Sequence, residues 1–152
     1  MTELATDKLR AFITKHLPLI QHMGIQLEDY QAGKLTLSMP LFKNHNDKMT
    51  AFGGSLYCLN LTTSIGLLFI QCFERGIEPN LVVRHAEIDY FAPASSPTIL
   101  AKSQNIDATD WEQFFNDFNK NQKAFIEISS ETFDKGQLAV TFTGQFAIIG
   151  AN

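Results

Sequence analysis

The feature that most constrains this chain is an apolar stretch of about twenty residues that runs from Gly53 to Glu74. If the stretch is helical, apolar side chains occupy nearly every face, which is typical of a membrane span or of a helix buried inside a protein. A membrane would place the amides of Asn60 and Gln71 in hydrocarbon, and no aromatic belt flanks the stretch. We therefore expect a helix buried in protein, and Gly76 just beyond it predicts a left-handed C-cap.

The segments on either side of this helix predict the layers that surround it. An amphipathic helix, with apolar residues at three- and four-residue spacing, precedes Pro18, which should end it. Side chains then alternate over residues 24–30 and 34–39, which predicts an antiparallel pair of strands. Four further strands are expected at residues 81–94, 96–106, 123–135 and 136–150.

A short helix is expected between the second and third of these later strands. Thr109 and Glu112 have the spacing of a capping box, and aromatic residues line one face of the segment. These aromatic residues are Trp111, Phe114, Phe115 and Phe118. We expect this face to cover another part of the protein.

Together these segments predict an α+β fold in a single domain that spans residues 1–152. A curved antiparallel sheet of about six strands, wrapped around the long helix, would bury that helix on every side. An open sheet leaves an edge strand, and such an edge commonly pairs with a second copy of the chain. We therefore expect a homodimer, with a dimer of dimers (a homotetramer) as a further assembly.

The composition supports one globular domain and argues against several kinds of partner. The 152 residues are 45% hydrophobic and 18% charged, which fits a sizeable core. The net charge of −4 and the absence of a Lys/Arg cluster argue against nucleic-acid binding. The N-terminal sequence lacks the features of a secretory signal, so we expect a cytoplasmic protein with no membrane partner. Cys58 and Cys72 would lie about 21 Å apart on one helix, too far to form a disulfide.

The long helix begins with a glycine pair, Gly53 and Gly54. The first N–H groups of a helix have no partner within it, and the helix dipole adds about half a positive charge there. Glycine has no Cβ, so a ligand carbonyl can approach these amides closely. Such a helix start can stabilise an oxygen that becomes negative during a reaction, as in the attack on a thioester carbonyl.

Two segments carry a resemblance to a known family. NHNDKMTAFGGSLY at residues 44–57 and HAEIDYFAPA at residues 85–94 resemble segments of the hotdog-fold acyl-CoA thioesterases. More specifically, residues 5–149 resemble the thioesterase domain of the YiiD C-terminal type. The resemblance implies a hotdog fold and a hydrolase that cleaves acyl-CoA or acyl-carrier-protein thioesters with no cofactor of its own.

The resemblance also identifies departures from the family's usual site. Members commonly carry the motif His-Gly-Gly and a carboxylate on the first turns of the helix. In this chain Phe52 occupies the position of that His, and Leu61 occupies the position of the carboxylate. The polar positions upstream of the glycines are present as Asn46 and Asp47, and we place Phe52 among the substrate-binding residues.

The candidate catalytic residues are therefore Asn46, Asp47, Gly53 and Gly54. Asp47 could act as general base or nucleophile, with Asn46 orienting the attacking water. In the alternative interpretation, Asn46 and Asp47 only cap and turn the loop, as Asn and Asp commonly do.

Three further residues are candidate substrate contacts, each with a structural alternative. Ser55 could donate to the oxyanion, although a first-turn cap is the favoured interpretation. Asn60 could hold a water molecule or be a buried amide that the backbone satisfies. His85 alternates with Glu87 and Asp89 along one strand, and this row could reach the partner's active site or be a solvated polar row.

Two functions remain open on the sequence alone. The first is a thioester hydrolase, and the alternative is a hotdog module that binds an acyl-CoA or fatty acyl group without cleaving it. Acetyl transfer in its usual fold needs a glycine-rich turn for the CoA pyrophosphate, and this chain has no such segment. The 4 histidines show no metal-ligand spacing, so no metal site is expected.

Overall fold

The computed structural model describes residues 2–150, so Met1, Ala151 and Asn152 of the expected domain lie outside the described residues. The helices are α1 (Thr2–His16), α2 (Pro18–His22), α3 (Gly53–Glu74) and α4 (Ala108–Asn121), with a short 3-10 turn at Leu41–Lys43. The strands are β1 (Gln26–Gln31), β2 (Lys34–Pro40), β3 (Leu81–Tyr90), β4 (Thr98–Ser103), β5 (Lys123–Asp134) and β6 (Gln137–Ile149).

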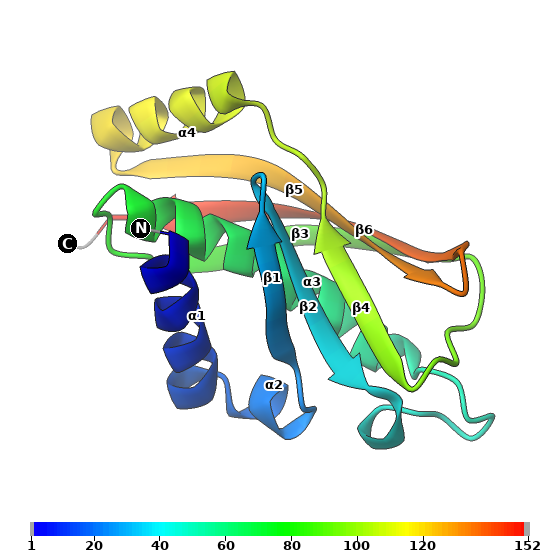
Figure 1. Cartoon of the computed structure of the whole chain (residues 1–152). Coiled ribbons are helices and arrows are strands. Elements are labelled where there is room, and N and C mark those ends of the chain that lie inside the picture. Colours follow the sequence, from blue (N-terminus) through cyan, green and yellow to red (C-terminus); the bar gives the residue numbers. More distant parts are fainter. Residues whose placement is uncertain (1, 151–152) are drawn as a thin grey trace.

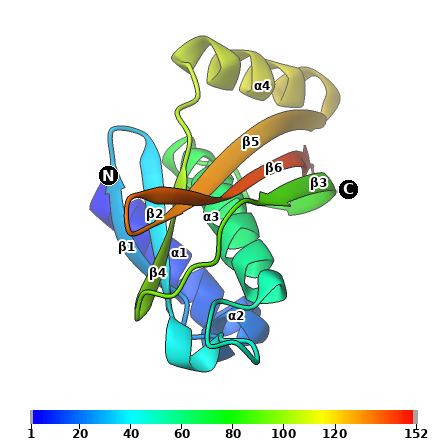
Figure 2. The ribbon, with the colours of Figure 1, turned by 90° about the vertical axis from the view of Figure 1, so that its right-hand side faces the viewer.

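The strands form one six-stranded sheet in the order β1-β2-β4-β5-β6-β3, and every neighbouring pair is antiparallel. The sheet curves around α3, as the two views in Figures 1 and 2 show. This arrangement confirms the predicted α+β hotdog fold, in which a curved antiparallel sheet is wrapped around a long central helix.

The central helix α3 forms the middle of the core. By length and composition it could cross a membrane, but 67% of its most apolar window is buried inside the protein. Leu59, Leu67 and Ile70 are completely inaccessible to solvent, which confirms the expectation that this helix is buried in protein. The helix ends at Glu74, and Gly76 has a φ of 68°, the left-handed conformation expected beyond its C-terminus.

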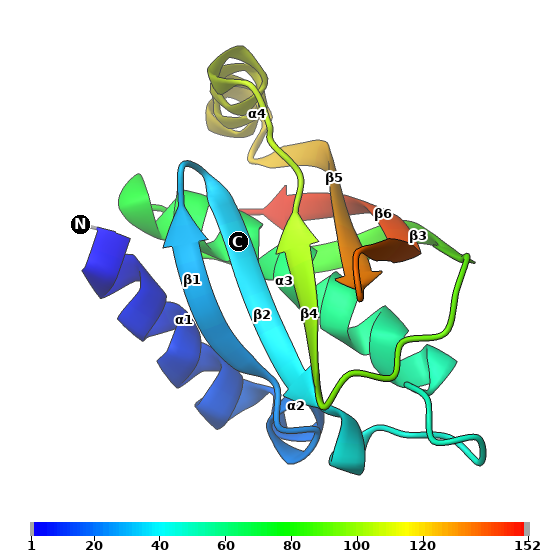
Figure 3. The same ribbon diagram turned by 45° about the vertical axis from the view of Figure 1, so that its right-hand side comes forward.

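The two N-terminal helices lie on the side of α3 next to β1 (Figure 3). The first helix ends before Pro18 as expected, since α1 ends at His16. The sequence did not predict α2, in which Pro18 is the first residue and its missing N–H breaks no helical hydrogen bond. Leu9 and Ile13 are buried in the core, and the Phe12 ring lies 4.9 Å from that of Phe69 on α3.

The helix α4 lies along β5, near the C-terminal end of α3 (Figure 1). The predicted capping box is wrong: Thr109 lies inside the first turn, Asp107 is the N-cap residue, and no side chain caps the helix. The aromatic face is buried as predicted, since Trp111, Phe114, Phe115 and Phe118 are all buried. The guanidinium of Arg75 lies 4.2 Å from the centre of the Phe115 ring and links α4 to the end of α3.

The sheet has two edges, β1 and β3, and β3 is the longer edge strand with 10 residues. It pairs with β6 along one side only, with a β-bulge between Val83 and His85. Regular alternation along the strand predicts that Arg84 lies on the face opposite His85, together with Ala86 and Ile88. Arg84 lies in the bulge and is exposed, whereas Ala86 and Ile88 are half-buried, so that prediction is wrong for Arg84. The unpaired side of β3 is the surface on which a second copy was expected.

Candidate functional site

The start of α3 is held in place by backbone hydrogen bonds to the loop before it and to the loop between β3 and β4. The Phe52 amide donates to the Asn44 carbonyl at 2.8 Å, and the Ala51 amide donates to the Ala94 carbonyl at 2.8 Å. The first helical bond runs from Leu56 N to the Phe52 carbonyl, at 3.0 Å. These bonds fix the residue before the helix and therefore the direction of the first helical amides.

The amides of Gly53, Gly54 and Ser55 have no hydrogen-bond acceptor among residues 2–150. Gly54 is exposed, and Gly53 and Ser55 are half-buried, so the helix start is open to solvent. Unpaired and accessible amides at the positive end of a helix of 22 residues are suited to bind a carbonyl oxygen or an anion.

Two aromatic rings lie against the glycine pair. A Cβ added to Gly54 would lie 2.7 Å from Cε2 of Phe52, so the Phe52 ring occupies the space that glycine leaves free. The hydroxyl of Tyr90 donates to the Gly53 carbonyl at 2.8 Å. Both aromatic residues are more than half exposed, at 56% for Phe52 and 51% for Tyr90, so they form the rim of the site rather than its floor.

Tyr90 has no role in the sequence-based predictions, although it lies within the second family-like segment. Burial raises the pKa of its hydroxyl, and the nearby Tyr57 and Cys58 raise it further. The phenol therefore remains a neutral hydrogen-bond donor at neutral pH. The contact with Gly53 joins residues 37 positions apart, a relation that no local sequence pattern contains.

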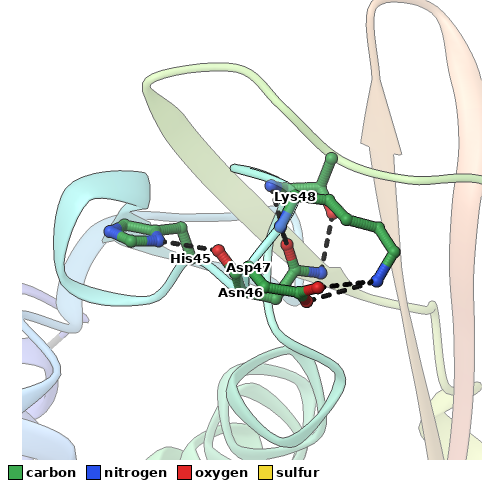
Figure 4. A network of polar contacts seen from close by, with 5 residues as sticks. His45, Asn46, Asp47 and Lys48 are labelled. Carbon is green, nitrogen blue, oxygen red and sulfur yellow. Dashed lines mark hydrogen bonds and ion pairs between the residues drawn. The ribbon is translucent and has the colours of Figure 1, made fainter.

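The loop before α3 is organised by the side chain of Asn46 (Figure 4). Its Oδ1 accepts hydrogen bonds from the amides of Lys48, at 2.8 Å, and Thr50, at 3.1 Å. Its Nδ2 donates to Oγ1 of Thr50 at 2.9 Å. This geometry matches the alternative in which Asn46 turns the loop, because its amide group is already occupied within the protein.

Asp47 lies on the outer side of the same loop, with 81% of its side chain exposed. Both of its carboxylate oxygens lie 3.2 Å from Nζ of Lys48. Figure 4 marks these contacts with dashed lines. His45 contacts the Asn46 carbonyl through Nδ1, at 2.9 Å. An exposed ion pair of this kind is weak and exchanges readily with solvent, so the Asp47 carboxylate remains available to water.

Asn60 lies inside the fold, on the second turn of α3, and is completely inaccessible to solvent. Its Nδ2 donates to the Leu56 carbonyl and to Oγ1 of Thr132, and its Oδ1 accepts from the hydroxyl of Ser130. Protein groups therefore satisfy the whole amide. This geometry favours the alternative in which Asn60 is a buried structural amide that joins α3 to β5.

His85 and Glu87 project from the same face of β3, as their alternation predicted. The Nε2 atom of His85 lies 3.2 Å from Oε1 of Glu87, and both side chains are mostly exposed. Asp89 continues the row and is also exposed. In a single chain this row is a solvated polar row at the sheet edge.

Asp134, at the end of β5, forms a hydrogen-bonded clamp that holds the loop before β4 near the site. Its carboxylate accepts hydrogen bonds from the amides of Ser95, at 3.0 Å, and Ser96, at 3.3 Å. Burial alone would raise the pKa of Asp134, but hydrogen bonds from Ser96 and Ser95 outweigh burial and hold the pKa below its ordinary value. Because the neighbouring Ala94 carbonyl binds Ala51, this clamp also supports the start of α3.

The two cysteines are unpaired and are poor nucleophiles. Burial raises the pKa of the Cys72 thiol to about 12 and also raises the pKa of Cys58. Both thiols are therefore protonated at neutral pH. Within residues 2–150, no three His, Cys, Asp or Glu side chains gather as metal ligands would.

The comparisons with known proteins agree with this architecture. The family model described as "Putative thioesterase (yiiD_Cterm)" matches residues 6–150. The crystal structure of a protein of unknown function from Chlorobaculum tepidum is 32% identical, with a TM-score of 0.94 over 98% of this chain and 96% of that one.

Two more distant solved structures share the fold. A protein described as a "putative thioesterase" from Shewanella oneidensis is 23% identical, with a TM-score of 0.82 over 97% of this chain and 99% of that one. A probable thioesterase from Pseudomonas aeruginosa is 19% identical, with a TM-score of 0.79 over 96% of each chain. Because the family model covers almost the whole chain, this protein belongs to the YiiD C-terminal family of thioesterase-like hotdog proteins.

Proposed function

We propose that this protein hydrolyses acyl-CoA or acyl-carrier-protein thioesters at the start of α3. The observation that carries the proposal is the set of accessible amides at Gly53, Gly54 and Ser55, which lack acceptors within residues 2–150. The thioester carbonyl oxygen would take the place of the missing acceptor. Membership of a thioesterase family supports this chemistry.

The amides of Gly53, Gly54 and Ser55 would mainly stabilise the transition state of the reaction. When water attacks the thioester carbon, the carbonyl oxygen becomes an oxyanion, and the sulfur leaves as a thiol once it has gained a proton. A donor already aimed at that oxyanion is worth about 3–4 kcal/mol of the barrier. The bonds at Ala51 and Phe52 hold the helix start in place, so little reorganisation is needed during the reaction.

We propose Asp47 as the group that activates water, because it is the carboxylate in the loop that leads directly into the helix. Its partner Lys48 would release it at small cost, since the ion pair is exposed. Asn46 would support Asp47 by fixing the conformation of the loop that carries both residues. Phe52 and Ser55, on either side of the glycines, would contact the substrate near the thioester.

The proposed assembly is a homodimer formed on the free side of β3. The strand carries exposed apolar residues, Val82 at 42% and Val83 at 43%, next to an unpaired row of backbone groups. A second copy paired there would satisfy this edge and bring His85 towards the partner's site. Sedimentation or light scattering should give twice the chain mass of 17.1 kDa, or four times that mass for a dimer of dimers.

The test of hydrolysis is thiol release from a panel of acyl-CoAs with short, medium, long and aromatic acyl groups. Asp47→Asn is expected to lower kcat at least tenfold, in line with general-base catalysis, whereas Asp110→Asn, an exposed carboxylate on α4, serves as the matched control. Inactivity of the wild type across the whole panel would reject hydrolysis. A rate that is unchanged in Asp47→Asn would reject this residue as the base.

The second candidate function is an acyl-binding module without turnover. Phe52 and Leu61 stand where the family commonly has a His and a carboxylate, and neither can transfer a proton. Tight binding of an acyl-CoA with no thiol release would identify this function.

A further inference from the structure

The hydroxyl of Tyr90 reaches the first peptide unit of α3 from a different part of the fold. It donates to the Gly53 carbonyl at 2.8 Å, across 37 positions of the sequence. A Cβ added to Gly53 would lie 3.5 Å from both Cζ and Oη of Tyr90, so the phenol lies directly against the backbone there. The end of β3 therefore acts on the start of α3 through this one side chain.

The carbonyl that Tyr90 contacts belongs to the same peptide unit as the Gly54 amide. This unit is planar and trans, so its C=O and N–H bonds point in opposite directions. A donor on the carbonyl draws electron density away from the nitrogen, and hydrogen bonds that are linked in this way strengthen one another. The Gly54 amide, which has no acceptor among residues 2–150, is therefore a stronger donor towards an oxygen that reaches it.

The same hydrogen bond restricts the rotation of this peptide unit. The unit lies between two glycines, which have no Cβ and therefore have more backbone freedom than other residues. A flip of the unit would turn the Gly54 N–H away from the direction in which it is exposed. The Tyr90 hydroxyl opposes such a flip because it holds the Gly53 carbonyl in its observed direction.

Tyr90 is itself held in place by the sheet. It pairs with Val140 on β6, and the amide of the next residue, Phe91, donates to the Ala139 carbonyl at 2.7 Å. Burial raises the pKa of the Tyr90 phenol, so its proton is present at neutral pH. The donor is therefore both fixed in position and protonated before any ligand arrives.

We propose that Tyr90 is a positioning residue, which orients and strengthens the Gly54 amide that receives the thioester carbonyl. The proposal rests on the proposed thioesterase function, because the Gly54 amide contributes to catalysis only if a thioester oxygen binds there. The strengthening matters most when that oxygen carries the negative charge of the transition state, so Tyr90 should affect kcat and leave KM nearly unchanged.

The size of the effect follows from two magnitudes. A preorganised donor to an oxyanion is worth about 10²–10³-fold in kcat, and a linked hydrogen bond strengthens its neighbour by roughly 10–30%. Applied to the logarithm of the rate, this fraction predicts that loss of the Tyr90 hydroxyl lowers kcat by about two- to eightfold.

The effect on the peptide unit can be measured without any substrate. Tyr90→Phe keeps the ring and removes the hydroxyl. In the labelled protein the Gly53 carbonyl carbon and the Gly54 amide nitrogen should both move upfield, because the carbonyl has lost a hydrogen bond. Tyr30→Phe is the matched control, since it removes the hydroxyl that accepts from Gln71 near the other end of α3 and should leave both resonances in place. Unchanged resonances in Tyr90→Phe would overturn the proposal.

The effect on catalysis is tested with the acyl-CoA that the wild type cleaves fastest. Tyr90→Phe should lower kcat by about two- to eightfold with a KM close to that of the wild type, whereas Tyr30→Phe should keep both values. Circular dichroism checks that each variant is folded. An unchanged kcat, or an equal loss in Tyr30→Phe, would overturn the proposal.

A further variant separates donor strength from shape. With 3-fluorotyrosine at position 90, the ring and the hydroxyl remain, but the hydroxyl is more acidic and donates more strongly. Near pH 6, where both phenols are protonated, kcat should exceed that of the wild type. A contact that serves only to pack the ring would give the same kcat for tyrosine and 3-fluorotyrosine, and that result would overturn the proposal even if Tyr90→Phe did not fold.

Failure of this proposal and failure of hydrolysis give different results. Thiol release with the same kcat in the wild type and in Tyr90→Phe would support hydrolysis and overturn the role of Tyr90. If no acyl-CoA is cleaved, the probe is a ketone analogue of butyryl-CoA. A smaller downfield shift of the Gly54 amide proton on ketone binding in Tyr90→Phe than in the wild type would support the role of Tyr90 and reject hydrolysis. Equal shifts in the two proteins would overturn both.

Discussion

Replacing Asp134 by Asn should destabilise the protein at neutral pH. The carboxylate accepts one hydrogen bond on each oxygen, from the amides of Ser95 and Ser96. Asn keeps only one side-chain oxygen, so one of the two amides loses its acceptor and faces an NH2 group instead. A hydrogen bond to a charged group contributes about 1.5–3 kcal/mol, and we expect the free energy of unfolding to fall by about 2–3 kcal/mol.

The effect should depend on pH in a defined direction. The folded-state pKa of Asp134 lies below its ordinary value, so the carboxylate stabilises the fold fully above the pKa of about 3.9 in the unfolded chain. This stabilisation is lost as the pH falls through the folded pKa. The difference between wild type and Asp134→Asn should therefore be largest near pH 7 and shrink towards pH 3.

Urea unfolding at several pH values between 7 and 3 measures this difference. Asp29→Asn is the matched control, because Asp29 is an exposed carboxylate on β1, and its unfolding midpoint should stay close to that of the wild type. A loss below about 0.5 kcal/mol at pH 7 would refute the reasoning, because a single lost charge-assisted bond is worth more. A difference that stays constant with pH would also refute it.

Three further outcomes are expected. Asn60→Ala should lower the free energy of unfolding by about 2–4 kcal/mol in urea titrations, because it removes the buried side-chain hydrogen bonds to Ser130 and Thr132 and opens a cavity. A destabilisation below 1 kcal/mol would place Asn60 outside the core network. Gly66→Ala should cost about 1–3 kcal/mol in the same assay, because its Cβ would lie 2.9 Å from Cδ2 of Leu35, whereas a neutral effect would mean that the core yields there. In the folded protein at pH 7 the buried Cys72 should react with a thiol reagent far more slowly than in urea, and equal rates would contradict its raised pKa of about 12.

The elements of the fold could be predicted because each has a local pattern. The apolar run of α3, the alternation in the six strands and Pro18 after the end of α1 are all visible within a few residues. The predicted N-cap of α4 is wrong because that prediction also used only a local pattern. Thr109 and Glu112 have the right spacing, but the helix begins earlier, after Asp107, so the spacing falls inside the first turn.

The parts of the site that the sequence does not reveal depend on contacts between distant segments. Tyr90 reaches Gly53 because the end of β3 passes beside the start of α3. Asp134 reaches Ser95 because the turn between β5 and β6 lies against the loop before β4. The β-bulge that separates Arg84 from the half-buried face of β3 depends on pairing with β6. No residue spacing along the chain encodes these relations.

The central claim is that the amides at the start of α3 receive the thioester carbonyl. The most direct measurement is the backbone amide spectrum of the 15N-labelled protein, with the resonances of Gly53, Gly54 and Ser55 assigned. The ligand is a ketone analogue of dodecanoyl-CoA, in which a methylene group replaces the thioester sulfur, and the control is S-dodecyl-CoA, which has no carbonyl. We predict that the ketone moves these amide protons downfield in a saturable way, as a new hydrogen bond does, and that the thioether does not. Equal shifts with both ligands, or no shift with the ketone at saturation, would contradict the claim.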